Sequence, residues 1–181
     1  YKTQFEDKIT IVDGSTSIPD DLSNDYALTV NNGDLTSTGK LSTPEGIKGT
    51  LTVTATDGNM NLNDVEGANI HLTAGKDVTI AGNATMTNGS INGKTVVFNS
   101  GDVNNLGTLN LIASSVNADS VSITAKEVKL GAVLDFDWLS ILAGKAITPT
   151  TIEAANDITI ATNGGNTILG ATINATNGTV T

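Results

Sequence analysis

The chain has 181 residues and a formal net charge of −10, and 38% of its residues are hydrophobic although only 3% are aromatic. It has nine lysines and no arginine. It also has no cysteine, and this absence excludes disulfides, thiolate nucleophiles and cysteine-based zinc sites. No basic face is left for nucleic acid or an anionic membrane surface, and no run approaches 18 uninterrupted apolar residues. We therefore expect neither a nucleic-acid partner nor membrane insertion.

The first 45 residues fit a regular pattern poorly. The stretch SIPDDLSNDYALTV (17–30) combines a proline with an acidic cluster, and TSTGKLSTPEG (36–46) has the composition of a loop. We predict an irregular N-terminal lead-in or capping segment over 1–45, because an uncapped coil would expose a strand edge. The regular domain is predicted to span 46–181.

From residue 49 onward, short runs alternate an apolar residue with Thr, Ser or Asn and are closed by Gly, Asn or Asp. This alternation predicts strands with one apolar face. The clearest examples are GTLTVTATD (49–57), AGKDVTIAGN (74–83), ADSVSITAK (118–126) and ANDITIATN (155–163).

The strands recur at a nearly constant spacing. The apolar residues that open them lie 19 residues apart from Leu51 to Ile70, 18 from Val78 to Val96 and 20 from Ile160 to Val180. A solenoid needs such a register, because equivalent residues of successive turns stack at the ~4.8 Å spacing of strands. At 18–20 residues per turn, we expect an all-β solenoid of about nine turns.

Each strand contributes an i, i+2 pair of apolar residues that is predicted to point into the core. These pairs are Leu51/Val53, Met60/Leu62, Ile70/Leu72, Val78/Ile80, Leu109/Leu111, Val121/Ile123, Val128/Leu130 and Ile158/Ile160. The residues between them are predicted to face solvent. Asn-Gly and Gly-Asn pairs at 32–33, 58–59, 82–83, 88–89, 92–93, 165–166 and 177–178 are predicted to form corners that need a positive φ.

The stretch GAVLDFDWLSILAGKAITP (131–149) departs most from the repeat. Leu134, Phe136 and Trp138 share one face of an extended chain, whereas Leu139 and Ile141 have the opposite parity. A β-bulge near residue 138 would return both sets to the core, and we favour this interpretation. Otherwise Leu134, Phe136 and Trp138 form an exposed patch for a lateral contact or for stacking on carbohydrate.

Few residues suggest catalysis or metal binding. His71 is the only histidine, alternates with buried positions and is not accompanied by a Gly-x-Ser-x-Gly motif, so we expect a surface histidine.

The oxygen-rich stretch DGNMNLND (57–64) fails the EF-hand pattern, and a second weak candidate for calcium is the cluster of Asp20, Asp21 and Asp25. Asp135 and Asp137 are spaced admissibly for a glycoside hydrolase, but solvated surface acids explain them equally well. We expect no enzyme activity, no cofactor and no metal site.

The repeated pattern x-V/I-T-I/L-x-A/G, at about 19 residues in an Asn-, Thr- and Gly-rich acidic chain, resembles one family. It is similar to the repeats of filamentous-haemagglutinin-type exoproteins, which are bacterial surface adhesins secreted by two-partner systems. The stretches that carry the resemblance are NIHLTAGKDVTIAGN (69–83), TLNLIASSVNADSVSITAKEVKLG (108–131) and NDITIATNGGNTILGATINATNGTVT (156–181). The resemblance implies a right-handed parallel β-helix that serves as an extracellular stalk. The NPNG or NPNL stretch of the family's secretion domain is absent, which points to a shaft segment or a subunit.

We therefore expect a non-enzymatic structural protein at the cell surface or outside the cell, either a shaft segment of a bacterial adhesin or a subunit of a surface filament. The expected partners are neighbouring repeat blocks or identical subunits that stack on the open β-helix ends, together with host-surface or matrix glycans. One alternative is a β-helix protein that binds or cleaves polysaccharide, and another is a polymerising cytoskeletal β-helix protein.

Overall fold

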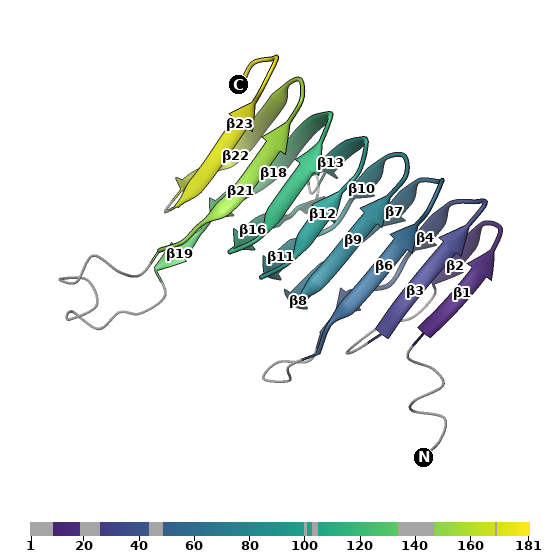
Figure 1. Cartoon of the computed structure of the whole chain (residues 1–181). Helices are drawn as coiled ribbons and strands as arrows, with labels where there is room; N and C mark the ends of the chain where they lie inside the picture. Colours follow the sequence, from purple (N-terminus) through teal and green to yellow (C-terminus); the bar gives the residue numbers. More distant parts are fainter. Residues whose placement is uncertain are drawn as a thin grey trace.

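The computed structural model describes residues 9–18, 26–43, 49–99, 101–102, 105–133, 147–168 and 170–181. In these residues the chain winds into a parallel β-solenoid, a rod of stacked turns (Figure 1). The described residues include no helix that is long and apolar enough to cross a membrane.

The cross-section of the rod has three faces, each a ladder of parallel strands. Face A is the eight-stranded sheet. Its strands are β1 (Ile9–Asp13), β3 (Tyr26–Asn31), β6 (Leu51–Ala55), β9 (Ile70–Ala74), β12 (Ser90–Asn92), β17 (Ser115–Ala118), β21 (Thr150–Ala154) and β23 (Ala171–Ala175).

Faces B and C together make up the eleven-stranded sheet. Face B contains β2 (Thr16–Ile18), β4 (Leu35–Ser37), β7 (Met60–Leu62), β10 (Val78–Ile80), β13 (Thr95–Asn99) and the first halves of β18 (Ser120–Leu130) and β22 (Ile158–Ile168). Face C contains β5 (Leu41–Ser42), β8 (Val65–Ala68), β11 (Ala84–Thr87), β16 (Thr108–Ile112) and the second halves of β18 and β22. The two faces join where the register of β18 and β22 shifts between Ala125 and Glu127.

The described chain forms six turns that have a strand on every face, which is fewer than the nine we expected. Paired residues on face A lie 19 positions apart from Val53 to Leu72, but 25 apart from Ile91 to Val116 and 36 apart from Val116 to Ile152. Insertions account for the longer turns. The antiparallel pair β14 (Gly101–Asp102) and β15 (Asn105–Leu106) follows face B, and β19 (Ala132–Val133) with β20 (Ile147–Thr148) follows face C. A solenoid tolerates such insertions at its corners, because the corner residues are not part of the strand pairing.

Residues 9–18 and 26–43, which we expected to belong to an irregular capping segment, instead carry β1–β5 in register with the later turns. Leu28, Val30, Leu35 and Leu41 are at most 5% exposed and continue the core. The alternation was hard to recognise because β2, β4 and β5 contain only two or three residues each, too few to establish a period of two.

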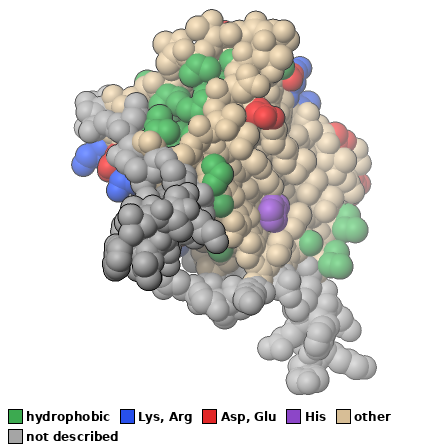
Figure 2. Space-filling view, turned by 60° about the vertical axis from the view of Figure 1, so that its left-hand side comes forward, with side chains coloured by type: hydrophobic (Ala, Val, Ile, Leu, Met, Phe, Trp, Pro, Cys, Tyr) green, Lys and Arg blue, Asp and Glu red, His purple; other side chains and the backbone are tan. Residues whose placement is uncertain are grey.

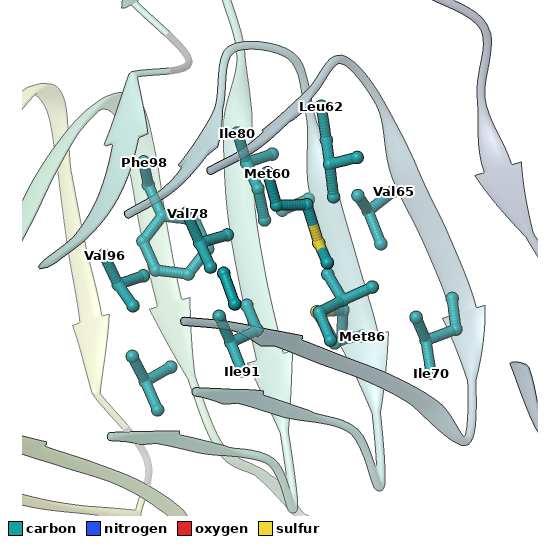
Figure 3. Packing of buried hydrophobic residues seen from close by; sticks show 14 of the residues in the cluster. Met60, Leu62, Val65, Ile70, Val78, Ile80, Met86, Ile91, Val96 and Phe98 are labelled. Carbon is teal, nitrogen blue, oxygen red and sulfur yellow. The ribbon is translucent and has the colours of Figure 1, made fainter. Parts of the chain in front are cut away.

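The core is a narrow stack of aliphatic side chains (Figure 3). Of the sixteen residues predicted to point inward, fifteen are at most 3% exposed, which confirms the predicted alternation. The exception is Ile160, which is half-buried because Val180 bridges to Ile158 rather than to Ile160. Among the described residues, Phe98 is the largest fully buried side chain, and it lies between Ile80 and Ile123 in its ladder.

Glycines at the corners are required mainly by the close approach of successive turns. Among the described residues of the seven Asn-Gly and Gly-Asn pairs, only Asn32 and Asn88 have a positive φ. A Cβ atom on Gly58 would overlap the carbonyl oxygen of Gly33 in the preceding turn, and one on Gly75 would overlap that of Thr56. The prediction of positive φ at every such pair is therefore wrong, and tight stacking is the more general reason for glycine at these corners.

A left-handed residue recurs where face C meets face A. Asn69, Asn88 and Ala113 occupy equivalent positions in three successive turns, with φ of 57°, 54° and 48°. A residue with a Cβ atom adopts this conformation at a cost of roughly 1–2 kcal/mol, and asparagine is one of the few that tolerates it. Ala113 is thus the strained member of the series.

We expect Ala113→Asn to raise the free energy of unfolding by about 1 kcal/mol, because it relieves this strain with the residue found in the two preceding turns. The corresponding increase in melting temperature is about 2–4 °C. Thermal unfolding followed by circular dichroism measures it, with Ala118→Asn as a control at a residue with no positive φ. A melting temperature equal to that of the unmodified chain would contradict the assignment of strain.

Candidate functional site

Several residues singled out in the sequence lie outside the described residues. These are Leu134, Phe136 and Trp138 of the candidate interaction patch, Asp135 and Asp137 of the candidate acid pair, and the cluster of Asp20, Asp21 and Asp25. The choice between a bulge and an exposed patch at 134–138 therefore stays a prediction.

His71 lies on β9 with its side chain on the outer surface of face A, as its alternation with Ile70 and Leu72 predicts. Figure 2 shows the histidine on a surface made mostly of backbone and uncharged polar side chains. Its Nδ1 atom lies 2.7 Å from Oγ of Ser90, its ladder neighbour in the next turn. Within the described residues it has no hydrogen bond to a carboxylate, so the arrangement lacks the third member of a nucleophilic triad.

Asp57 and Asn59 lie at one corner and Asn63 and Asp64 at another, on either side of β7, while Asn61 is exposed on β7 itself. Oδ1 of Asp57 accepts a hydrogen bond from the backbone N–H of Asn32, and Oδ1 of Asp64 accepts one from that of Asn83. The stretch therefore holds neighbouring turns together rather than surrounding a cation. Within the described residues, no group of three or more His, Cys, Asp or Glu side chains is placed to hold a metal ion.

Side-chain oxygens connect successive turns along the corner between faces A and B, which we call corner AB. Oγ of Ser15 accepts from the N–H of Asp34 at 3.1 Å, and Oδ1 of Asp34 accepts from the N–H of Asn59 at 2.7 Å. Oδ1 of Asn59 accepts in turn from the N–H of Asp77 at 3.1 Å. The corner amides point out of the strand ladders, and these oxygens supply the acceptors they require.

We expect Asp34→Ala to lower the free energy of unfolding by about 1–2 kcal/mol, because the N–H of Asn59 loses a charged acceptor. Asp77→Ala is the matched control: it lies at the same corner in a later turn, and its exposed carboxylate forms no hydrogen bond with a described residue. Its effect is expected to stay within about 0.5 kcal/mol. Urea unfolding of both variants tests the difference, and equal losses would show that the Asp34 hydrogen bond contributes nothing specific.

Corner AB contains two residues between β1 and β2 and three between β3 and β4, and it then shortens from β6 to β18. Four residues separate β6 from β7, three separate β9 from β10, two separate β12 from β13, and only Asp119 separates β17 from β18. Three residues again separate β21 from β22. The two short corners β12–β13 and β17–β18 are adjacent, and the surface there carries a shallow, open hollow of about 520 Å³ that we call the corner notch.

The corner notch combines small residues with polar side chains from three turns. It is lined by Ala74, Gly75, Asn92, Gly93, Lys94, Asn117, Ala118 and Asp119. Nδ2 of Asn117 donates a hydrogen bond to Oδ1 of Asn92 at 3.4 Å, while the side chains of Lys94 and Asp119 are exposed. Sequence reasoning missed this site, although a signal was present: the number of residues between consecutive strands falls at 93–94 and at 119.

The notch offers charged and amide side chains that a ligand could contact. Its ionisable side chains are one ammonium and one carboxylate, both exposed to solvent, and its remaining polar side chains are two amides. Its lining contains no histidine, hydroxyl or thiol side chain. Comparison of the chain with protein-family models, with curated proteins and with solved structures gives no match.

Proposed function

We propose that the chain is a non-enzymatic structural rod, a shaft segment of an extracellular adhesin or a subunit of a bacterial surface filament. The observation that supports this most directly is the unbroken succession of paired strands on face A. Each of its eight strands is hydrogen-bonded to the next, and its seven intervals of about 4.8 Å give a rod roughly 34 Å long over the described turns.

The surface of face A suits a role outside the cell. One outward ladder consists of Thr52, His71, Ser90, Ser115, Thr151 and Thr172. Hydroxyl-bearing side chains keep a flat sheet soluble without the lysine residues at which many proteases cleave. The paired backbone also leaves few extended segments for a protease to bind, which favours persistence in an extracellular environment.

The last described turns support a junction with a further turn. Ile173 is half-buried and Val180 is 45% exposed, whereas Leu72 and Ile91 in the middle of the rod are fully buried. A turn supplied by a neighbouring repeat block or by an identical subunit would cover these side chains and pair with β23. In pairing of this kind, a strand of one block or chain extends the open sheet edge of another.

Surface labelling tests the proposed location. An antibody raised against the recombinant chain is expected to stain intact source cells, and brief protease treatment of these cells is expected to remove the signal. Staining only after permeabilisation would contradict the proposal and favour the cytoskeletal alternative. Negative-stain electron microscopy of the purified chain then distinguishes single short rods, expected for a shaft segment, from filaments, expected for a polymerising subunit.

A further inference from the structure

We propose that the corner notch binds a short stretch of an acidic polysaccharide, one whose sugar units carry a carboxylate as well as hydroxyl groups. This inference is independent of the shaft proposal, because it depends on the local geometry of corner AB in three turns. Four observations carry it: the hollow itself, the hydrogen-bonded backbone around it, a lysine without an ion pair to a described residue, and the mixture of donors and acceptors.

The backbone around the notch has no free donors to offer. The N–H of Gly93 donates to the carbonyl of Asn117 at 3.1 Å, that of Lys94 to the carbonyl of Lys76 at 2.8 Å, and that of Asp119 to the carbonyl of Lys94 at 2.8 Å. A peptide that binds by strand addition would need unpaired backbone groups, and a bound phosphate would favour a nest of free amides. Recognition in the notch must therefore come from side chains.

The local charge differs from that of the rest of the corner. The three turns that line the notch place Lys76, Asp77, Lys94 and Asp119 at corner AB, so that two cations balance two anions, whereas Asp34, Asp57 and Asp157 lie at this corner in other turns without a lysine. Lys94 and its neighbour Lys76 form no ion pair with a described residue, unlike Lys40, which pairs with Glu66, and Lys129, which pairs with Glu127. In a chain of net charge −10, this is a position where an anionic group of a ligand finds a cation that pairs with no described residue.

The polar side chains of the notch complement a sugar acid. The Lys94 ammonium has three donors and suits a carboxylate, while the Asp119 carboxylate only accepts and suits a hydroxyl. The amides of Asn92 and Asn117 both donate and accept, as vicinal hydroxyl groups also do. A compact phosphate cluster would find one lining cation, Lys94, and would offer no hydroxyl group to the acceptor Asp119.

The notch is open and polar, so its occupant is a segment of a polymer that crosses the corner rather than an enclosed small molecule. The notch lining has no aromatic side chain on which a sugar ring would stack. We therefore expect weak binding at one site, with a dissociation constant on the order of 1 mM. Several rods displayed on one surface would strengthen attachment through multivalency.

Nuclear magnetic resonance of the isotopically labelled chain tests the proposal, with a hexamer of galacturonic acid as the acidic probe and maltohexaose as the neutral one. We expect the uronate to shift the amide signals of 92–94 and 117–119 and to lose its effect at high salt. Lys94→Gln is expected to weaken binding about threefold to fivefold, as the loss of one exposed ion pair would. Asn92→Ala combined with Asn117→Ala is expected to abolish the localised shifts.

Lys129→Gln is the matched control, because it removes the same charge from face C and leaves the notch intact. Localised shifts that depend on Lys94 and not on Lys129 support the proposal. Three outcomes overturn it: no localised shift up to about 10 mM, which is ten times the expected dissociation constant; equal weakening by Lys94→Gln and Lys129→Gln; or binding of maltohexaose as strong as that of the uronate. None of these outcomes affects the surface-labelling test of the shaft proposal.

Discussion

Leu72→Ala is expected to lower the free energy of unfolding by about 2–5 kcal/mol, the range typical of leucine truncated in a packed core. Leu72 is fully buried and lies between Val53 and Ile91 in the inward ladder of face A. The narrow core is bounded by strands on all three faces, so the neighbouring turns cannot collapse into the space without breaking their own hydrogen bonds. Urea unfolding followed by circular dichroism measures the change.

The matched control is Thr73→Ala, one residue further along the same strand. Thr73 is exposed on the outer surface of face A, so its truncation removes little packing and is expected to change stability by about 0.5 kcal/mol or less. The pair tests the alternation directly, because both changes shorten a side chain of β9. Similar losses for the two variants would mean that β9 does not present Leu72 to a core and Thr73 to solvent.

Gly58→Ala is expected to destabilise the chain by about 1–3 kcal/mol through overpacking between turns. The added Cβ atom would overlap the carbonyl oxygen of Gly33 and would lie 2.8 Å from Oδ1 of Asp34. Gly58 does not have a positive φ, so alanine fits its backbone conformation. From the backbone conformation alone we would expect a gain in stability of about 0.4–1 kcal/mol, because alanine makes the unfolded chain less flexible. The sign of the measured change therefore decides whether the turns stack as closely as described.

Gly14→Ala separates this effect from backbone strain. Gly14 lies at the same corner of the first turn, where an added Cβ atom would meet nothing within 4 Å, although its φ is 96°. Both variants are expected to lose stability, but only Gly58→Ala is expected to shift the amide signals of Gly33 and Asp34 in the preceding turn. If Gly58→Ala stabilises the chain or leaves these signals unchanged, the close contact at this corner is refuted.

The inward alternation of single strands was predictable because a period of two is a local property. The pair of Val78 and Ile80 identifies a buried face within three residues, and the structure buries both side chains completely. Strand ladders were also predictable where turn length stayed constant: Val78 pairs with Val96, 18 residues later. Where a turn is lengthened by an insertion, as between Val116 and Ile152, the spacing no longer indicates which strands are neighbours.

The candidate site was less predictable, because every feature of it depends on contacts between turns. Asp34 and Asn59 are 25 residues apart, and no local pattern indicates that the carboxylate of one accepts the amide hydrogen of the other. Likewise, Lys94 and Asp119 come together only because their turns are adjacent and their corners are short.

The sequence by itself determined that this chain is a β-solenoid with an aliphatic core and a hydroxyl- and amide-rich exterior, because hydrophobic alternation and its repetition are written along one strand at a time. Only the tertiary structure decided the three-faced cross-section, the number of turns, the reason for glycine at the corners and the notch at 92–94 and 117–119. These depend on how many residues lie between strands and on which atoms meet when one turn stacks on the next. Such distances between turns arise from packing and have no counterpart in a local pattern of residues.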